Sequence, residues 1–409
     1  MTKTILLPGA FDTKGPEYAY LKELIESQGF KVFTMNWGVL GGTTLFPVQV
    51  DSKAVALAGG RDIGKLQLEK DQKTAMEIME KGVTVLTRKL YAEGKIHGVL
   101  GLGRVRSTKV ITAAMRALPL GIPKVMISTV AAGDISALVG VKDILLFPSI
   151  VDISGLNRIS KVIFRQAVGA VCGMMQMEAD APSAQKPVIT ITLFGQTKPC
   201  VDRCREALEQ KGYEVLVFHA TGTGGRTMEA MVEDGYVQAV LDITPTEVAD
   251  ALYGGIFSAG AERLEAPGKM GIPHLIVPGC VDMVNFGPIN TVPQKYKDRK
   301  LVESKAAVTL MRTNVEENAE MGEVFARKIN KTGGKAAFLI PLRGLSRYDR
   351  EGEIFWWPEA DRAFFTALEK SLAKHIPIEK VDCHINDEPF ARKAVEMLLA
   401  MMEKKETIF

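Results

Sequence analysis

Long hydrophobic runs are missing from this sequence. No apolar stretch among its 409 residues approaches the roughly 20 that are needed to cross a bilayer. The opening residues, MTKTILLPGAFDTK, turn polar too soon for a secretory signal, and they predict a first buried strand instead. This pattern excludes a membrane-spanning helical protein. We therefore expect no membrane partner and a cytoplasmic location.

Cysteine is also scarce. The chain has five cysteines, an odd number, and they are widely scattered. Such a pattern excludes a disulfide framework and favours a reducing compartment. The five are Cys172, Cys200, Cys204, Cys280 and Cys383.

Neither sign of charge is in large excess. The formal net charge is +3, which argues against bulk affinity for nucleic acid. Hydrophobic residues make up 46% of the chain, so sizeable cores can form and no compositional sign of disorder is present. A chain of this length predicts two domains.

What the sequence does contain is a regular alternation of short apolar runs and amphipathic stretches. Residues 4–8 and 31–37 read as strands, and Leu21, Leu24 and Ile25 share one face of a helix between them. Further strands are predicted at 97–102, 123–128 and 143–149. Strand, helix and strand in repetition predict a parallel sheet that is covered by helices on both faces.

The same pattern restarts in the second half of the chain. Thr13-Lys14 and Thr197-Lys198 each follow a phenylalanine, and each precedes a proline and a helix-like run. This internal duplication predicts an α/β fold with two tandem Rossmann-like, doubly wound parallel-sheet domains and an interdomain cleft. The first domain carries an extra stretch near 38–90.

The domain boundaries follow from a small, polar, proline-bearing stretch, ADAPSAQKP, at 179–187. We predict a first domain at 1–180, a linker at 181–187 and a second domain at 188–409. The last helix, predicted at 388–405, is available to pack on the first domain.

The stretch HATGTGGRTMEA, at 219–230, follows a predicted strand of the second domain. In a doubly wound sheet, ligands bind at the carboxyl ends of the strands. Glycine amides and the positive end of the next helix suit a phosphate or carboxylate, and arginine can grip it with two hydrogen bonds. The alternative is a glycine-rich turn without a ligand. The predicted ligand residues here are Thr221, Gly222, Thr223, Gly224, Gly225 and Arg226.

We interpret GLGRVRSTKVIT, at 101–112, as the matching loop of the first half. Its arginines bring positive charge but block the closest backbone approach, so side chains rather than amides would hold an anion. The alternative is that both arginines are solvated. Ser107 or Thr108 is predicted to cap the following helix. The predicted ligand residues here are Gly101, Gly103, Arg104, Arg106, Ser107 and Thr108.

A third loop, GAFDTKGP at 9–16, ends the first predicted strand. Lys14 suits a phosphate, Asp12 suits Mg²⁺ or the orientation of Lys14, and Thr13 lies between them. A structural Asp-Lys pair is the rival interpretation. Pro16 is predicted at the first position of the helix. Asp282 follows a strand of the second domain and is predicted to orient a ribose or a water molecule.

Three residues are candidates for catalysis. His219 closes a strand beside the glycine loop and suits general acid/base chemistry. Cys200 begins a helix, where the dipole lowers a thiol pKa, although a small buried apolar role is the rival interpretation. Asp242 also follows a strand. No metal site is predicted from protein ligands alone.

Seven stretches together give the chain a resemblance to a known family. They are PGAFDTKGPEY, MRALPLGIPKVMIST, PSIVDISGLNRIS, FHATGTGGRTMEAM, PGCVDMVNFGP, VTLMRTNVEEN and CHINDEPFA. Over essentially its whole length, the chain resembles the ATP-binding domain family of the tomato mosaic virus resistance protein and its bacterial and fungal relatives. The resemblance implies two Rossmann-like domains, ATP as a ligand, and a barrel-fold partner protein.

The same resemblance implies a ligand site drawn from Asp12 to Lys14, from 101–108 and from Thr221 to Arg226. Relatives usually carry a Gly-Gly-Ser-Gly-Gly-Thr type of loop where this chain has GRVRST. Phosphates that lie on that loop in relatives cannot lie the same way here. The departure implies that ATP binding, or the family's reaction, is lost or changed.

Three functions agree with these patterns. The first, which we predict, is a protein that binds ATP or a phosphorylated or carboxylated metabolite in the interdomain cleft, as an enzyme of small-molecule catabolism. The second is an enzyme that recognises a carboxylate through the arginine loop and uses His219 or Cys200. The third is a non-catalytic ligand-sensing or protein-binding module that has lost ATP binding. We expect a small anionic ligand and a homo-oligomer.

Overall fold

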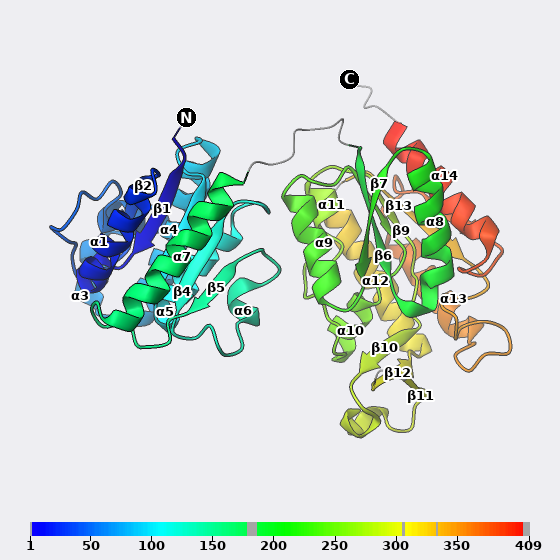
Figure 1. The fold of residues 1–409 in the computed structure, drawn as a ribbon. Coiled ribbons are helices and arrows are strands. Elements are labelled where there is room, and N and C mark those ends of the chain that lie inside the picture. The colour runs from blue at the N-terminus through cyan, green and yellow to red at the C-terminus, as the bar shows by residue number, and fades with distance from the viewer. Residues whose placement is uncertain (1, 178–185, 305–306, 333, 404–409) are drawn as a thin grey trace. The chain divides into compact units, whose positions relative to one another are not determined.

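The computed structural model describes residues 2–177, 186–304, 307–332 and 334–403, and the chain divides into two compact units, Met1–Ala181 and Pro182–Phe409. Each unit is built on a parallel sheet with helices on both faces (Figure 1). The predicted α/β fold with two doubly wound domains is therefore confirmed. Residues 181–185 of the predicted linker lie outside the described residues.

The first domain has a five-stranded parallel sheet in the order β2-β1-β3-β4-β5. The chain moves outward from β1 to β2 and then crosses back to β3, so the strand order reverses between β1 and β3. Such a reversal is where doubly wound sheets open a crevice for ligands. The strands are β1 (Thr4–Gly9), β2 (Lys31–Asn36), β3 (Gly98–Gly103), β4 (Lys124–Ser128) and β5 (Leu145–Pro148).

Side-chain alternation along β1 assigns the helices to the two faces of this sheet. Ile5 and Leu7 pack in one buried cluster with residues of α1 (Phe11–Ser27) and α7 (Arg158–Gln176). Leu6 points the other way and packs with residues of the helices on the opposite face. Those helices are α2 (Ser52–Gly59), α3 (Ile63–Glu69), α4 (Gln72–Ala92) and α5 (Val105–Arg116); α6 (Ser136–Val139) is a short turn beside α5.

Tyr18 of α1 joins β1 to β3 where the two strands separate. The strands pair only at Ile5↔Gly98 and Leu6↔Val99. Further along, the buried Tyr18 hydroxyl lies 2.8 Å from the Pro8 carbonyl and 2.9 Å from the Leu102 carbonyl, and it accepts a hydrogen bond from the Leu102 amide at 3.1 Å. One phenol thus replaces the missing strand pairing beside the crevice.

We expect Tyr18→Phe to lower the free energy of unfolding of the first domain by about 1–3 kcal/mol, because it leaves buried backbone groups without a partner. The measurement is denaturant unfolding followed by Trp37 fluorescence in a chain whose Trp356 and Trp357 are phenylalanine. An unchanged midpoint would show that water replaces the phenol at no cost.

The second domain repeats this plan with one more strand. Its parallel sheet has the order β7-β6-β8-β9-β13-β14. The first five positions match the order of the first domain, as the internal duplication predicts. The strands are β6 (Val188–Leu193), β7 (Glu214–His219), β8 (Ala239–Asp242), β9 (His274–Ile276), β13 (Ala336–Pro341) and β14 (Ile378–Val381). An antiparallel sheet of β10 (Met283–Phe286), β12 (Val308–Arg312) and β11 (Leu301–Ser304) follows β9.

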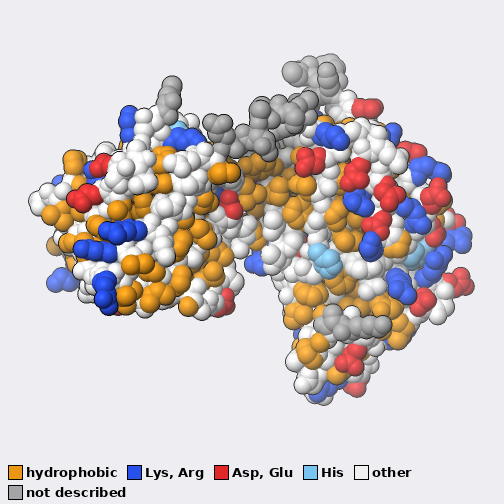
Figure 2. Space-filling model, in the orientation of Figure 1, with side chains coloured by type: hydrophobic (Ala, Val, Ile, Leu, Met, Phe, Trp, Pro, Cys, Tyr) orange, Lys and Arg blue, Asp and Glu red, His pale blue; other side chains and the backbone are white. Residues whose placement is uncertain are grey.

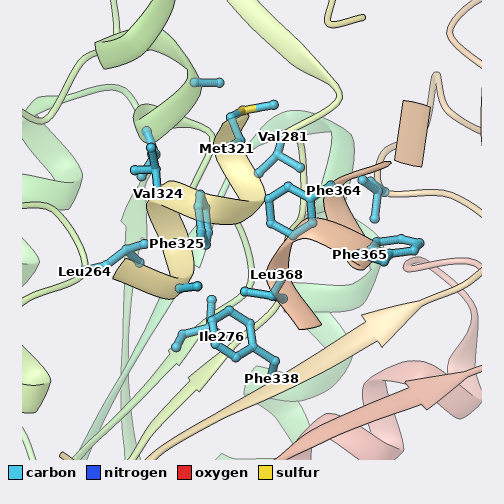
Figure 3. Packing of buried hydrophobic residues seen from close by; sticks show 14 of the residues in the cluster. Leu264, Ile276, Val281, Met321, Val324, Phe325, Phe338, Phe364, Phe365 and Leu368 are labelled. Atoms are coloured by element: carbon cyan, nitrogen blue, oxygen red, sulfur yellow. The ribbon is translucent and has the colours of Figure 1, made fainter. Parts of the chain in front are cut away.

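Two layers of helices cover this sheet. Phe325 and Phe364 meet edge to face at 5.2 Å where α12 and α13 pack over Ile276 and Phe338 of the strands (Figure 3). On the other face, α14 buries Phe390 against α8 and the sheet of its own domain. The helices are α8 (Lys198–Gln210), α9 (Thr223–Glu233), α10 (Glu247–Tyr253), α11 (Ala266–Lys269), α12 (Val315–Thr332), α13 (Pro358–Ser371) and α14 (Glu388–Glu403).

Candidate functional site

A cavity of about 830 Å³ opens at the carboxyl edge of the first sheet, where the order reverses between β1 and β3. The segments that follow β1, β2 and β3 form three of its sides, and the turn between α3 and α4 forms the fourth. The structure thus brings two of the predicted site segments, Asp12 to Lys14 and Arg104 to Ser107, into one cavity. The wall also includes Trp37, Val39, Leu66, Gln67, Lys70 and Met76.

These predicted loops are in fact the first turns of helices. Only Ala10 separates β1 from α1, and only Arg104 separates β3 from α5. Ser107 and Thr108 lie inside α5 and do not cap it, so the prediction of a cap was wrong. The Thr108 hydroxyl instead lies 2.7 Å from that of Ser128 and bonds back to the Arg104 carbonyl at 3.0 Å.

The start of α1 explains why its sequence reads as a loop. The helix begins at Phe11, earlier than the proline predicts, and its backbone leaves helical geometry at Lys14. Pro16 follows this kink, in the first turn of the straight part of the helix. A proline is tolerated there because the amide that it lacks would have no partner in a first turn.

The amino end of α5 offers unpaired donors to the cavity. Its N-cap residue, Arg104, makes no side-chain capping bond, and the amides of Val105, Arg106 and Ser107 meet no acceptor among the described residues. A 12-residue helix concentrates partial positive charge at these groups. The cavity therefore has an anion-binding end made of backbone as well as side chains.

Three cationic side chains near this helix end differ in whether they already have a hydrogen-bond or ion-pair partner. The Lys14 ammonium donates to the Ile153 carbonyl at 2.6 Å, and Arg104 is held by the carboxylate of Asp152. Arg106, by contrast, forms no hydrogen bond or ion pair with any described residue. Of these three, the Arg106 guanidinium is the cation most available to a ligand.

Asp12 lies at the opposite side of the same crevice. Its Oδ2 accepts a hydrogen bond from the Leu40 amide at 3.0 Å, whereas its buried Oδ1 has no partner among the described residues. The carboxylate packs so closely on Gly38 that a Cβ there would collide with it. The indole nitrogen of Trp37 is also buried and has no hydrogen-bond partner in the described part of the chain. Both groups have unused hydrogen-bonding capacity in the cavity wall.

The glycines of the first-domain loop serve packing. A Cβ at Gly101 would collide with Ile111, and one at Gly103 would collide with Ser107. Both glycines therefore allow α5 to lie close against β3, as glycines do at the start of doubly wound folds. Sequence reasoning missed the wall residues 37–40 and 66–76, although the extra stretch begins at the carboxyl end of β2.

The glycine-rich loop of the second domain is occupied by a side chain of the same domain. Glu247 of α10 is fully buried, and its Oε1 accepts from the amides of Gly222 at 2.7 Å and Gly225 at 3.0 Å. A Cβ at Gly225 would collide with this carboxylate. Two of the amides predicted to face an anion thus already bind an internal one.

The remaining residues of that segment start a helix. Thr223 to Arg226 form the first turn of α9, and Thr221 precedes the N-cap Gly222. A Cβ at Gly224 would collide with the His219 carbonyl. Arg226 is exposed, and its Nε donates to the Gly222 carbonyl at 3.3 Å within its own helix.

The topology also corrects the match between the two halves. The glycine-rich segment follows β7, whose counterpart is β2, whereas 101–108 spans the end of β3, whose counterpart is β8, and the start of α5. Residues 219–230 and 101–112 therefore do not occupy equivalent places. The sequence suggested this equivalence because both segments contain glycines followed by arginine and threonine.

Asp242 lies in a buried ion network beside that loop. Both of its oxygens accept from the Arg263 guanidinium, at 2.6 and 2.7 Å, and the Arg263 Nε donates to Glu247 at 2.7 Å. Burial works to raise the pKa of Asp242, but the charge of Arg263 and the hydrogen bond of His274 hold it well below its ordinary value. A carboxylate fixed in this way suits a structural role better than proton transfer.

The other catalytic candidates have contrasting environments. His219 is exposed at the end of β7 and packs edge to face on Phe194 at 5.5 Å, and partial burial lowers its pKa. Cys200 is fully buried, and its hydrogen bond with Cys204 and its burial raise its pKa well above the usual value. The thiol is therefore protonated at neutral pH, which opposes a nucleophilic role.

Asp282 is also fully buried, in the second domain. Its Oδ2 accepts a hydrogen bond from the Ser346 hydroxyl at 2.7 Å, while its Oδ1 has no partner among the described residues. Burial and the nearby charge of Asp349 raise the pKa of Asp282 to about 7. This environment holds a carboxyl group away from solvent.

Surface charge is mixed on the face seen in Figure 2. Acidic and basic side chains alternate over the second domain on that face, with no large area of one sign. Among the described residues, no helix has both the length and the apolar character that a bilayer-spanning helix requires. In the same part of the chain, no group of three or more His, Cys, Asp or Glu side chains is arranged to hold a metal ion.

Comparison with known proteins gives matches over both domains. The N-terminal domain model of the uncharacterised protein family UPF0261 matches residues 3–180, and its C-terminal domain model matches residues 186–402. A UPF0261 protein of Clostridium tetani is 45% identical over 99% of this chain and 100% of its own length. The ToMV susceptible protein tm-1(GCR26) of Solanum lycopersicum is 36% identical over 97% of this chain and 55% of its own length.

Solved structures give much weaker similarity. A UDP-GlcNAc 2-epimerase of Methanocaldococcus jannaschii is 9% identical over 99% of this chain and 94% of that chain, with a TM-score of 0.22. A glycosyltransferase of Streptomyces sp. SF2575 is 14% identical over 68% of this chain and 82% of that chain, also with a TM-score of 0.22.

Proposed function

Since the chain belongs to the uncharacterised protein family UPF0261, we propose a function from its own site: the first domain binds a small organic anion in the β1–β3 cavity. ATP with Mg²⁺ and phosphorylated or carboxylated metabolites are the ligands proposed. The protein would use this site as an enzyme of small-molecule catabolism.

One observation carries this proposal. The amides of Val105, Arg106 and Ser107 and the guanidinium of Arg106 have no partner among the described residues, and they lie in one cavity at the strand-order reversal. Donors without acceptors at a helix start favour a phosphate or carboxylate there. The side-chain cation replaces the backbone contacts that a loop richer in glycine would supply.

The rest of the cavity suits the body of such a ligand. Trp37, Leu66 and Met76 provide apolar contact, and Gln67 adds a polar group. Asp12 has a free oxygen that could accept from a ligand hydroxyl or take part in binding Mg²⁺ brought in with phosphates. A volume of about 830 Å³ is in the range of sites for molecules of nucleotide size.

A screen by thermal unfolding tests the proposal first, with ATP, phosphorylated sugars and organic acids, each with and without Mg²⁺. A ligand that binds only the folded chain raises the unfolding temperature by mass action. No shift with any member of this panel would overturn the proposed ligand class.

Arg106→Ala is then expected to weaken binding of the ligand found in the screen by about 10- to 100-fold, the usual range for a hydrogen bond to a charged group. Titration calorimetry measures the affinity. The matched control is Lys109→Ala on the same helix, because Lys109 pairs with Glu80 and lies outside the cavity wall. Equal affinities for the Arg106 variant and the parent chain would contradict the proposed site.

A second candidate function is a non-catalytic ligand sensor. It is favoured by the cavity wall, which includes no histidine or cysteine among the described residues. The candidate His219 and Cys200 both belong to the second domain. Product formation from the bound ligand, or its absence under saturating conditions, decides between the enzyme and the sensor.

A further inference from the structure

The segment of residues 149–157 runs from the end of β5 back across the carboxyl edge of the first sheet. The Ser149 amide donates to the Ser128 carbonyl of β4 at 3.0 Å, and the Gly155 amide donates to Glu17 of α1 at 2.8 Å. Ile153, between them, is buried in the core under α1 and α7. The backbone of the segment is therefore anchored at several points beside the cavity.

Asp152 extends from this anchored segment to Arg104, the residue that joins β3 to α5. The Arg104 Nε donates to Asp152 Oδ1 at 2.7 Å, and its Nη2 donates to Oδ2, so the two planar groups face each other. This pairing uses one edge of the guanidinium in the way that a ligand carboxylate or phosphate would. Arg104 also forms part of the cavity wall, whereas Asp152 does not.

The pair is positioned to open at little cost. The Arg104 and Asp152 side chains are 56% and 54% exposed, and ion pairs at such exposure contribute at most about 1 kcal/mol. Asp152 needs only a change of side-chain rotamer to move away, because its neighbour Ile153 keeps the backbone in place. A negatively charged group that entered the cavity would compete for the same guanidinium.

We propose that Asp152 is an internal competitor for the anion site: its carboxylate occupies Arg104 until the anionic group of the ligand takes its place. This inference rests on the proposed function, and it adds Arg104 to Arg106 as a second side-chain contact of the ligand. The affinity of the site then depends on how much stronger the ion pair between Arg104 and the ligand is than the ion pair between Arg104 and Asp152. A substitution at position 152 should therefore change the affinity.

The test is a double-mutant cycle measured by titration of the full chain with ATP and Mg²⁺. Asp152→Asn should tighten ATP binding about fivefold, the upper range for an exposed pair. Arg104→Ala should weaken it, and Asp152→Asn should have no effect in the Arg104→Ala chain. Asp134→Asn removes an exposed carboxylate that pairs with no arginine among the described residues, and it should leave affinity unchanged.

The outcomes separate this inference from the function on which it rests. If Asp152→Asn changes nothing while Arg106→Ala still weakens binding, Asp152 does not compete and the cavity remains the ligand site. If Asp152→Asn tightens binding equally with and without Arg104, the effect is loss of a nearby charge, and the proposed exchange is wrong. If ATP does not bind the parent chain under any condition, this inference fails for ATP, and failure of the whole screening panel removes the proposed function too.

Discussion

Replacing Arg263 with methionine should cost the second domain about 3–5 kcal/mol of its free energy of unfolding. Arg263 is 1% exposed and is the cation at the centre of three carboxylates. It contacts Asp242 through two hydrogen bonds, Glu247 at 2.7 Å and Glu229 at 3.2 Å. Without it, the buried carboxylates of Asp242 and Glu247 have no cation to offset their desolvation.

The loss should extend to the glycine-rich segment. The Glu247 carboxylate accepts hydrogen bonds from the amides of Gly222 and Gly225, and it keeps its charge in the interior because Arg263 is paired with it. When Arg263 is removed, burial favours the neutral form of Glu247, which is a weaker acceptor for two amides. The start of α9 should therefore lose order before the sheet does, and faster amide hydrogen exchange at 222–225 would report it.

Denaturant unfolding measures the predicted loss in a Trp37→Phe background, where Trp356 and Trp357 report on the second domain alone. A rescue variant keeps the test valid if the single change prevents folding. Arg263→Met combined with Asp242→Asn and Glu247→Gln removes the uncompensated charges and should recover much of the stability. A single variant that unfolds at the same midpoint as the parent would refute the central role of Arg263.

The sheet architecture could be predicted because it depends on local patterns. Ile5 and Leu7 lie on one face of β1 and Leu6 on the other, and both faces are buried, so the strand appears in the letters as a continuous apolar run. The same run recurs at Ile189 and Ile191 in β6. The parallel order follows from such strands alternating with helices, without knowledge of any side-chain contact.

The helix starts were less predictable. Asp12 and Arg104 lie near junctions where a single residue separates strand from helix, and glycine is required at 103 because a Cβ there would collide with Ser107 of α5. Glycine, threonine and lysine have the composition of a loop, and tertiary packing overrides that local preference. Asp12 and Arg104 were nevertheless predicted at the correct edge of the sheet, because the ends of β1 and β3 were predicted correctly.

Charge pairing could not be predicted at all. The sequence shows Arg104 and Arg106 as equals two positions apart, but Asp152 binds only the first. Likewise, nothing near the glycine-rich segment indicates that Glu247, more than 20 positions later, will lie on its amides. Partners so distant along the chain are determined by the fold. The amino-acid sequence alone therefore does not show which arginine is paired with a carboxylate and which is free.

Removing the charge of a buried carboxyl group in the second domain is predicted to stabilise that domain, whereas removing Arg263 is predicted to destabilise it. Asp282 is fully buried, and its neighbours Asp349 and Asp361 compete with it for the buried cation Arg312. Burial and the charge of Asp349 raise the pKa of Asp282 to about 7, against an ordinary value of about 3.9. Asp282 Oδ1 and Asp349 Oδ1 both lack a hydrogen-bond partner among the described residues, so neither oxygen has a donor that would favour its charged form.

The sign of the pH dependence follows from this shift. Between about pH 4 and 7 the folded chain keeps a proton on Asp282 that the unfolded chain releases, so the folded state binds more protons. Stability must then fall as the pH rises through this window, by about 2–4 kcal/mol from this group. Asparagine at 282 can still accept a hydrogen bond from Ser346 and carries no charge at any pH. We therefore expect Asp282→Asn to remove this fall.

Asp282→Asn should make the second domain about 2–4 kcal/mol more stable than the parent at pH 8, and little different at pH 4, because the parent carboxyl is protonated there. Unfolding midpoints at both pH values, again in the Trp37→Phe background, measure this difference between the variant and the parent, in which the titration of groups that do not contact Asp282 cancels. Asp382→Asn is the control, since Asp382 is exposed and its hydrogen bond to Arg343 lowers its pKa, which gives a small effect of the opposite sign. A gain of equal size at pH 4 and pH 8 would show that Asp282 destabilises the fold through packing and not through its charge.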